Sequence, residues 1–428
     1  MPRRSCAYER PTRSARTDRD REPVRTDRSS DKYDTETDLK FKSFKILAIA
    51  AACAAPALAS AQFQLGSGVE MRIYGVADIM MQHYRADGDG GTHTRSVVDA
   101  GGLGSSRLGF LFTKELANGM KAGVRLESGF NTDSGRLGST GGSADRVYSR
   151  QAYVSLAGSF GEVRMGRVQG PSYLYSLDFD PAQLGPYGTQ GALLIQGSGT
   201  PGTPSRALDP NVPAGSVGFM INPISRTDNT IHYLSPKFGG FSLQASHSPS
   251  ESVAGASSMT NAYLRYETGD WAFGYAIHHL GNNRRGGAVK TTDVLEHSIG
   301  VFTKVIKGTD LGLTFSYKDK TNQAVDANGD VAISKAEKAL ILSGVTRLTE
   351  VDHLLYTIGQ YFSPLDDADA RSAALYYRHY IDPTFAVFAG ISYLTQDDNS
   401  QIRPSPSAPR VRAGGDVTTF SVGVNFRF

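Results

Sequence analysis

The chain has 428 residues, a formal net charge of +3 and 39% hydrophobic side chains. Its mean hydropathy is −0.30, and only residues 46–58 form a continuous apolar run, so a protein built from membrane-spanning helices is excluded. The 47 glycines, 20 tyrosines and 20 phenylalanines suit a β-rich protein with many tight turns, whether soluble or membrane-spanning.

The segment 39–61 has the pattern of an export signal. Lys40, Lys42 and Lys45 precede the apolar run, and Ala59-Ser60-Ala61 follows it. A basic start, a short apolar stretch and a small-residue motif define a secretory signal peptide, which we predict to be cleaved after Ala61. The apolar stretch is too short for a stable transmembrane helix.

Residues 1–38 are rich in arginine and aspartate and almost free of apolar side chains. Export signals do not normally begin behind such a leader, so we interpret translation as starting at Leu39; a genuine disordered extension is the alternative. Residues 1–61 hold 13 of the 45 basic and 9 of the 42 acidic residues, which leaves 32 and 33 in the mature chain. The positive net charge disappears, so nucleic-acid binding has no support. Both cysteines are removed as well, and no disulfide is expected.

Amphipathic segments follow one another through the remaining chain, 62–428. In the last of them, apolar Phe420, Val422 and Phe426 share one side of a strand, and the residues between them are small or polar. The same alternation predicts sixteen strands, at 69–84, 104–115, 119–130, 146–158, 161–169, 227–236, 239–248, 259–268, 270–280, 294–305, 309–319, 338–349, 352–361, 370–380, 383–394 and 416–428.

Tight and long connections alternate between these strands. Seven connections are tight, and the eight others are longer and richer in glycine, aspartate, asparagine and proline. Short turns on one rim, long loops on the other and an even strand number predict an all-β, 16-stranded antiparallel transmembrane β-barrel. Both termini then lie at the short-turn, periplasmic rim, and the lumen is wide enough to hold water.

One connection is much longer than the others. It runs over 170–226, spans 57 residues and contains eight prolines. Loops of this length in compact folds are usually functional. We predict that this third loop folds into the lumen and narrows the channel.

Several segments also match a known family in their order and spacing. They are Tyr74-Gly75-Val76-Ala77-Asp78, Ser106-Arg107-Leu108-Gly109, Leu126-Glu127-Ser128-Gly129-Phe130, Arg150-Gln151-Ala152-Tyr153-Val154, 160–167, 229–242 and the terminal Phe428. These segments resemble the trimeric general porins of the Gram-negative outer membrane, especially the beta-proteobacterial type. The resemblance covers 69–428.

The resemblance implies an outer-membrane homotrimer that lets small hydrophilic solutes and ions diffuse passively through three pores. It also implies contact with outer-membrane lipid and lipopolysaccharide, and insertion by the barrel assembly machinery, for which Phe428 resembles the recognition signal. No cofactor is implied. A substrate-selective channel for anions, sugars or organic acids is one alternative. A structural or adhesive barrel plugged by its own loop is another.

In that family, carboxylates on the third loop face a basic ladder across a constriction. By motif, Arg107 and Arg150 take ladder positions, Asp180 and nearby Asp178 take the place of the loop carboxylates, and Tyr173 takes that of an aromatic residue. Arg125 and Glu127 have lumen-facing parity, and Arg167, of opposite parity, is assigned to the trimer contact. The alternative is that these side chains are ordinary solvated residues. The third loop is longer than its enterobacterial counterpart and lacks its P-E-F-G-G signature, which leaves open which carboxylate reaches the constriction.

Other motifs carry less weight. Asp326, Asn328, Asp330 and Glu337 have the spacing of an EF-hand calcium loop, but Val331 replaces the glycine that the turn needs, so a polar surface loop is the preferred interpretation. The histidines show no metal-ligand spacing, since His278 and His279 point to opposite faces of a strand. No nucleotide-binding motif or nucleophile elbow is present, so no enzymatic activity is expected.

Overall fold

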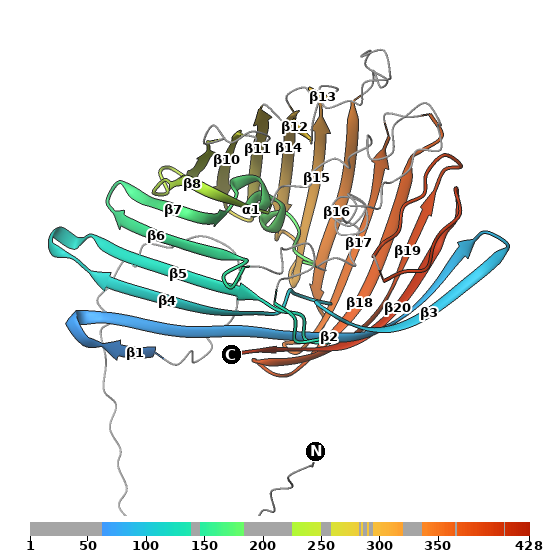
Figure 1. Ribbon diagram of the computed structural model, residues 1–428, viewed down its shortest axis with the longest axis horizontal. Helices are drawn as coiled ribbons and strands as arrows, with labels where there is room; N and C mark the ends of the chain where they lie inside the picture. Colours follow the sequence, from blue (N-terminus) through green and yellow to red (C-terminus); the bar gives the residue numbers. More distant parts are fainter. Residues whose placement is uncertain are drawn as a thin grey trace, which may run out of the picture. The chain divides into compact units, whose positions relative to one another are not determined.

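A computed structural model describes residues 62–137, 146–183, 225–249, 258–281, 284–285, 289–290, 294–319, 336–363, 366–405 and 407–428. In these residues eighteen strands form one antiparallel sheet, and β12 and β13 form a separate short hairpin (Figure 1). The strands are β1 Gln62–Leu65, β2 Val69–Gly88, β3 Gly91–Ala100, β4 Arg107–Glu115, β5 Lys121–Gly129, β6 Gln151–Gly158, β7 Gly161–Gln169, β8 Arg226–Leu234, β9 Phe241–Ser248, β10 Ser258–Thr268, β11 Trp271–Gly281, β12 Arg284–Arg285, β13 Val289–Lys290, β14 Val294–Thr303, β15 Thr309–Lys318, β16 Glu337–Arg347, β17 Asp352–Phe362, β18 Ala370–Asp382, β19 Phe385–Gln396 and β20 Val417–Arg427.

The sheet closes on itself at β2. Along one edge, residues 69–76 of β2 pair with β4 and residues 79–88 pair with β3. Along the other edge, residues 69–72 pair with β1 and residues 76–86 pair with β20. With β1 and β3 counted as additions to the rim of β2, the described strands form a closed 16-stranded antiparallel β-barrel.

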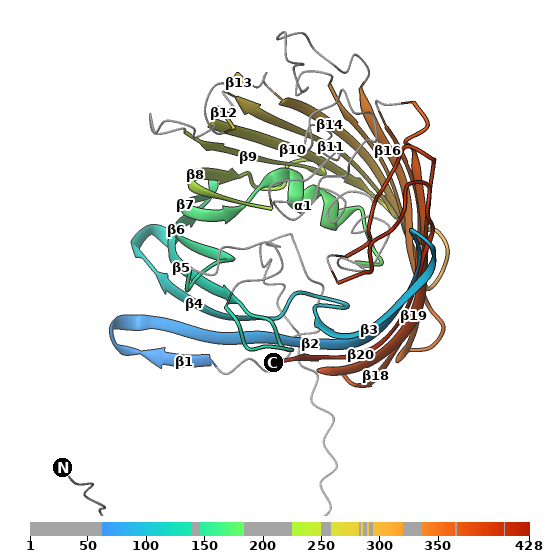
Figure 2. The ribbon, with the colours of Figure 1, turned by 45° about the vertical axis from the view of Figure 1, so that its right-hand side comes forward.

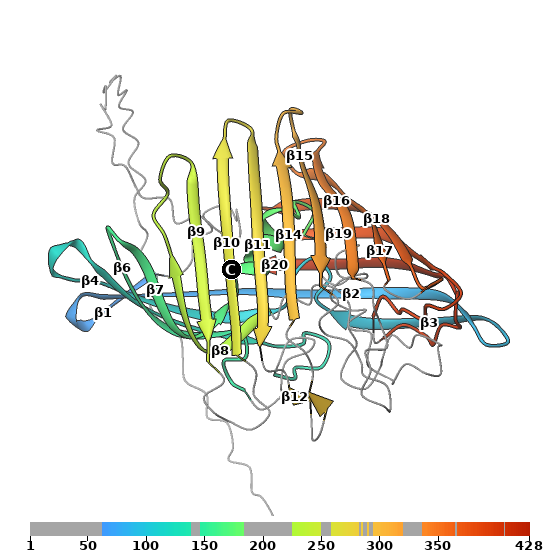
Figure 3. The same cartoon turned by 90° about the horizontal axis from the view of Figure 1, so that it is seen from above.

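All sixteen strands expected from the sequence are present, with ends that differ by a few residues. Figure 3 shows the long strands β9, β10, β11, β14, β15 and β16 side by side. The short strand β1 and the strand β3 were not predicted. Strand β3 folds back on residues 79–88 of β2, and its first six residues, Gly-Thr-His-Thr-Arg-Ser, carry no apolar alternation by which a strand is recognised.

The two faces of the barrel wall differ in chemistry. On β20, Phe420 and Val422 are exposed on the outer face, whereas Thr419 and Ser421 are buried on the inner face. The same alternation places Leu340 and Leu342 outside on β16. Apolar residues outside and polar residues inside are the arrangement that a barrel needs in lipid.

One helix, α1 (Pro171–Asp178), occupies the start of the third loop and was not predicted. It begins with a proline at its first position, where the missing N–H costs nothing. Figure 2 shows α1 on the inner side of the strands, against β9, β10 and β11. Among the described residues, no helix is long and apolar enough to cross a membrane.

Candidate functional site

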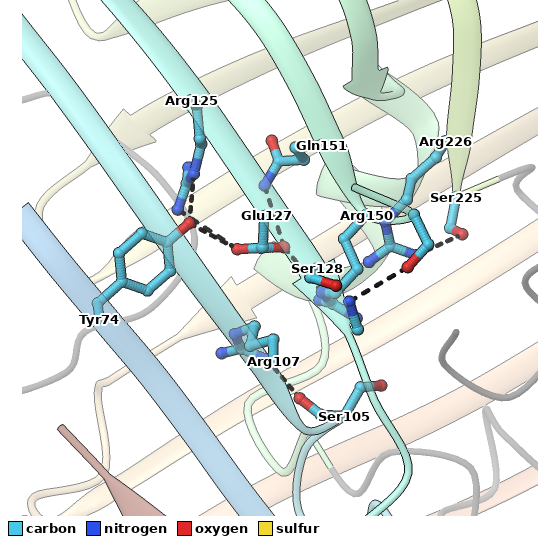
Figure 4. A network of polar contacts seen from close by, with 12 residues as sticks. Tyr74, Ser105, Arg107, Arg125, Glu127, Ser128, Arg150, Gln151, Ser225 and Arg226 are labelled. Atoms are coloured by element: carbon cyan, nitrogen blue, oxygen red, sulfur yellow. Dashed lines mark hydrogen bonds and ion pairs between the residues drawn. The ribbon is translucent and has the colours of Figure 1, made fainter. Parts of the chain in front are cut away.

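A charged network lies on the inner face of β4, β5 and β6 (Figure 4). Arg150 donates from Nε to Oε1 of Glu127 at 2.7 Å, and the Tyr74 hydroxyl donates to Oε2 at 2.7 Å. Arg125 donates from Nε to the same hydroxyl at 2.7 Å, and its Nη2 lies 3.7 Å from Glu127 Oε2. Two arginines and a tyrosine therefore hold one carboxylate in place.

The local sequence explains this geometry. Arg125 and Glu127 are two residues apart on β5, so both side chains point to the inner face. Gly109 on β4 is the cross-strand partner of both Tyr74 and Glu127. A Cβ at position 109 would lie 2.1 Å from Cζ of Tyr74, so the glycine leaves the space that the tyrosine ring fills.

Two further arginines extend the positive charge. Arg107 donates from Nη1 to the carbonyl of Ser105 at 3.1 Å and lies within electrostatic range of Glu127. The Arg226 guanidinium lies 5.8 Å from the ring centre of Tyr173, and Nη1 donates to Ser225 Oγ at 3.0 Å. Its Nε and Nη2 are buried and have no hydrogen-bond partner in the described part of the chain. Four guanidinium groups thus lie within electrostatic range of the Glu127 carboxylate.

The start of the third loop lies against another part of the wall. Tyr175 and Phe179 pack over glycines in three adjacent strands: an added Cβ would lie 2.2 Å from Phe179 at Gly274, 2.6 Å from it at Gly300 and 2.1 Å from its carbonyl oxygen at Gly312. Tyr263 on β10 contacts both rings edge-on. The glycines therefore form a groove that seats the segment 171–181.

The two loop aspartates lie on this opposite wall and do not pair with the arginine network. Tyr263 donates its hydroxyl to Asp178 Oδ2 at 2.8 Å, and Nη1 of Arg265 lies 3.1 Å from the same oxygen. Ser343 on β16 donates to Asp180 Oδ1. Burial raises the pKa of both carboxyl groups. The charge of Arg265 opposes this rise at Asp178, and the hydrogen bond from Ser343 opposes it at Asp180.

The last long connection, between β19 and β20, also folds inward. Ile402, Ala408 and Val411 are buried in one cluster with Tyr84 and Ile341 of the inner wall. Gln396 fixes the base of this connection by donating to the carbonyls of Ile402 and Gly415 at 3.1 and 2.7 Å. The sequence contained no signal for this second inward segment, because its polar residues are those of an ordinary loop.

The remaining predicted site residues lie elsewhere. Arg167 bonds within its own chain, with Nη1 2.7 Å from Asp228 Oδ1 and Nε donating to the Ser149 carbonyl at 2.7 Å. Phe428 exchanges backbone hydrogen bonds with Gly75 at 2.8 and 3.1 Å. Of the calcium candidates, Asp326, Asn328 and Asp330 lie outside the described residues. Glu337 is an inner-wall residue of β16, with Oε1 3.5 Å from Lys318 Nζ. No cluster of three or more metal-ligating side chains occurs within the described ranges.

Sequence reasoning missed two residues of the network. Tyr74 stands in a quoted motif and has inward parity, so the alternation of β2 could have singled it out. Arg226 is the first residue of β8 and lies just before the strand expected at 227–236, so the alternation assigned it no face. Only the fold brings it next to Tyr173.

A closed 16-stranded barrel with an apolar outer face, a polar inner face and a charged inner site defines a channel-forming protein of the outer membrane. The family model described as Gram-negative porin matches residues 47–399, and the chain belongs to this family. It is 25% identical over 368 residues to outer membrane porin protein 32 of Delftia acidovorans, covering 83% of this chain and 93% of that protein.

Solved structures show the same fold. The anion-selective porin from Comamonas acidovorans superposes with a TM-score of 0.67 at 21% identity, covering 84% of this chain and all of that one. OmpT of Vibrio cholerae superposes with a TM-score of 0.55 at 14% identity, covering 85% and 99%. A further OmpT structure is described as a trimer form. The protein is thus an outer-membrane porin.

Proposed function

We propose that this porin conducts small hydrophilic solutes and ions passively, with a preference for anions. The observation that carries the preference is the inner-wall network in which Arg107, Arg125, Arg150 and Arg226 lie within electrostatic range of one carboxylate in the described part of the chain, that of Glu127. In a confined lumen such an excess of one charge attracts the opposite ion and repels the like ion. The sequence suggested a more balanced constriction, with Asp178 and Asp180 opposing the arginines.

The contacts of the two aspartates support the anion preference. The charge of Asp178 is compensated by Arg265 at 3.1 Å, and burial favours the neutral form of Asp180. Neither carboxylate makes a described contact with the four arginines. The solved structure whose title names an anion-selective porin has the same fold, which is consistent with this assignment.

We infer a homotrimer from the outer face. Exposed outward residues on β6, β7 and β8 are aliphatic (Val154, Leu156, Met165 and Ile231), whereas β9 to β20 expose aromatic residues such as Trp271, Phe273, Tyr377 and Phe426. Aromatic belts mark surfaces that meet the lipid interface. On the described residues of β6 to β8 the exposed outward positions are aliphatic, and the aromatic residues there are the half-buried Tyr233 and, in the β6–β7 turn, Phe160. This favours protein contact along these strands, and lipid and lipopolysaccharide contact elsewhere. The assignment of Arg167 to the contact between subunits belongs to the same proposal.

The N-terminal processing is also a proposal. Cleavage after Ala61 leaves Gln62 as the first residue, and Gln62 is the first residue of β1, paired with Arg72 of β2. The signal peptide 39–61 and the leader 1–38 would then be absent from the mature porin. N-terminal sequencing of the outer-membrane protein tests the cleavage site, and mapping of ribosome initiation tests the start at Leu39.

Reversal potentials of the purified porin in a potassium chloride gradient across a planar bilayer test the ion preference. We expect the sign of an anion-selective channel, with a larger potential at low salt, because salt screens charges beyond roughly 8–10 Å at ordinary ionic strength. Ohmic current without solute-saturable block would favour a general porin over a substrate-selective one. Negligible conductance would favour a plugged barrel, and a cation-selective potential would overturn the proposed preference.

A further inference from the structure

A second group of basic side chains lies on the inner face at the other end of the strands, next to the tight-turn rim. Arg347 at the end of β16 is the cross-strand partner of His353 on β17, and His353 is the partner of Arg378 on β18. All three have the parity of buried inner-wall residues, such as Val345, Leu355 and Tyr376 in the same strands. They form a continuous row across three strands, which we call the rim row.

Arg378, at the β18 end of the rim row, is held in a defined orientation. The Arg378 guanidinium lies 4.9 Å from the ring centre of Tyr380, and Nη2 lies 3.0 Å from Nδ1 of His353. His353 in turn contacts the Tyr380 ring edge-on at 5.2 Å. Stacking fixes the plane of a guanidinium and leaves its edge available for planar, bidentate partners. Nε of Arg378 is buried and has no hydrogen-bond partner in the described part of the chain.

A fourth basic group comes from the terminal strand. Arg427 on β20 lies within electrostatic range of Arg378, as does Arg347. Its Nε donates to Asn425 Oδ1 at 2.9 Å, a neutral acceptor. On β19, between β18 and β20, the small buried residue Ala386 is the cross-strand partner of both Tyr380 and Asn425.

Carboxylates compensate only part of this charge. Arg347 forms two bonds to Asp310, at 3.1 and 2.7 Å. Asp352 lies on the outer face of the wall. Its carboxylate accepts a hydrogen bond from the Tyr377 hydroxyl and lies 2.7 Å from His379 Nδ1. Arg378 and Arg427 therefore face the lumen, and in the described part of the chain their hydrogen-bond partners, His353 and Asn425, carry no negative charge. Like charges held together in this way favour an anion between them.

We propose that Arg378 and Arg427, with the rim row beside them, form an oxyanion-binding site at the tight-turn mouth of the channel, for solutes that carry a phosphate or carboxylate group. The site lies on β18 and β20, whereas Glu127 and its network lie on other strands, β5 and its neighbours. It rests on the proposed function only for anions that arrive from the long-loop side, which must pass through the lumen to reach it. A site at this mouth would hold an anion after it passes the narrow part of the channel.

The test is block of the chloride current by inorganic phosphate, added in turn to each side of a bilayer that contains porins inserted in one orientation. We expect phosphate added at the tight-turn side to block at lower concentration than phosphate added at the opposite side. Arg378→Gln and, separately, Arg427→Gln should raise the half-blocking concentration about tenfold or more, as expected for the loss of a charged hydrogen bond of roughly 1.5–3 kcal/mol. Arg378→Lys should recover part of the block.

Arg371→Gln is the matched control, because Arg371 lies on the outer face of the same strand, paired with Asp397 at 3.6 Å. Equal block from both sides, or an unchanged half-blocking concentration in both Arg378→Gln and Arg427→Gln, would overturn the site. The reversal potential of the wild type in potassium chloride reports the proposed anion preference separately. A wild type without that preference but with side-dependent phosphate block would refute the proposed preference and retain the site.

Discussion

Arg150 and Glu127 form an ion pair that is almost completely buried, with 6% and 3% of their side chains exposed and 2.7 Å between Nε and Oε1. Removing one charge from such a pair leaves the other desolvated and uncompensated, at a cost of about 3–5 kcal/mol. Glu127→Gln should therefore lower the thermal stability of the barrel and strengthen the anion preference. Heat-induced unfolding followed on gels and reversal potentials measure the two effects, and a variant equal to wild type in both would contradict the role of this pair.

Arg226 should contribute to selectivity although no sequence motif marks it. Arg226→Ser removes one of four positive charges, so the reversal potential should shift towards cations, and the shift should grow as salt is lowered. Arg107→Ser and Arg150→Ser should act in the same direction. Arg371→Ser, on the outer face, is the control and should leave the potential unchanged. An Arg226→Ser channel that matches this control at low salt would remove Arg226 from the site.

The third loop should remain seated in mild acid. Burial raises the pKa of Asp180, so the seated loop binds a proton at a pH where the released loop does not. Linkage then makes seating more favourable as the pH falls through the raised pKa, and this gain is complete below the ordinary pKa of an aspartate. Hydrogen exchange of 171–183, corrected for the intrinsic rate, should slow between neutral and mildly acidic pH.

Asp180→Asn gives the matched comparison, because the amide carries no titrating group. The exchange rate of this variant should depend less on pH than that of the wild type. The pH dependence that is left is expected from Asp178, because burial raises the pKa of that carboxyl group as well. Its effect on reversal potential should be small compared with that of Arg150→Ser. Faster exchange of the wild-type segment in acid would show that the sign of this linkage is wrong.

The glycine groove should set the position of the third loop. In Gly312→Val a Cβ would lie 2.1 Å from the Phe179 carbonyl oxygen and 2.9 Å from Cδ of Pro181. Overpacking of this kind costs about 1–3 kcal/mol, which displacement of the loop can relieve. We expect a changed and more variable single-channel conductance. Gly66→Val is the control, because no atom lies within 4 Å of the Cβ position there; equal conductance in both variants would argue against the groove.

Phe428 should matter for assembly. Its backbone bonds to Gly75 join the last strand to the first, and its ring fills the space above that glycine. Phe428→Asp should sharply reduce the amount of porin in the outer membrane, while a change of the equally exposed Phe420 to leucine should not. Quantification of the protein in membrane fractions decides this, and normal levels of Phe428→Asp would refute an assembly role.

The barrel could be predicted because each strand carries its own evidence. The alternation along β20 or β15 reports which side faces the lumen, and the tight turns report the pairing of neighbours. The wall residues Arg125 and Glu127 followed from that alternation, whereas Arg107 and Arg150 followed from the motifs that the chain shares with the porin family. The partners of Asp178 and Asp180 could not be predicted, because Arg265 and Ser343 belong to strands far along the chain and no local pattern records where a loop settles.

The seat of α1 also bears on the order in which the molecule is made. The described strand contacts of Phe179 and Asp180 are with β10, β11, β14, β15 and β16, all of which follow the loop in the chain, and Ser343 lies 163 residues after Asp180. Contacts between such distant residues form late, because the intervening chain must be ordered first. We therefore expect nascent barrels to pass through a stage in which the wall is closed and the loop is still free. Leakage through the membrane would then be greatest in newly inserted molecules and decline as they mature.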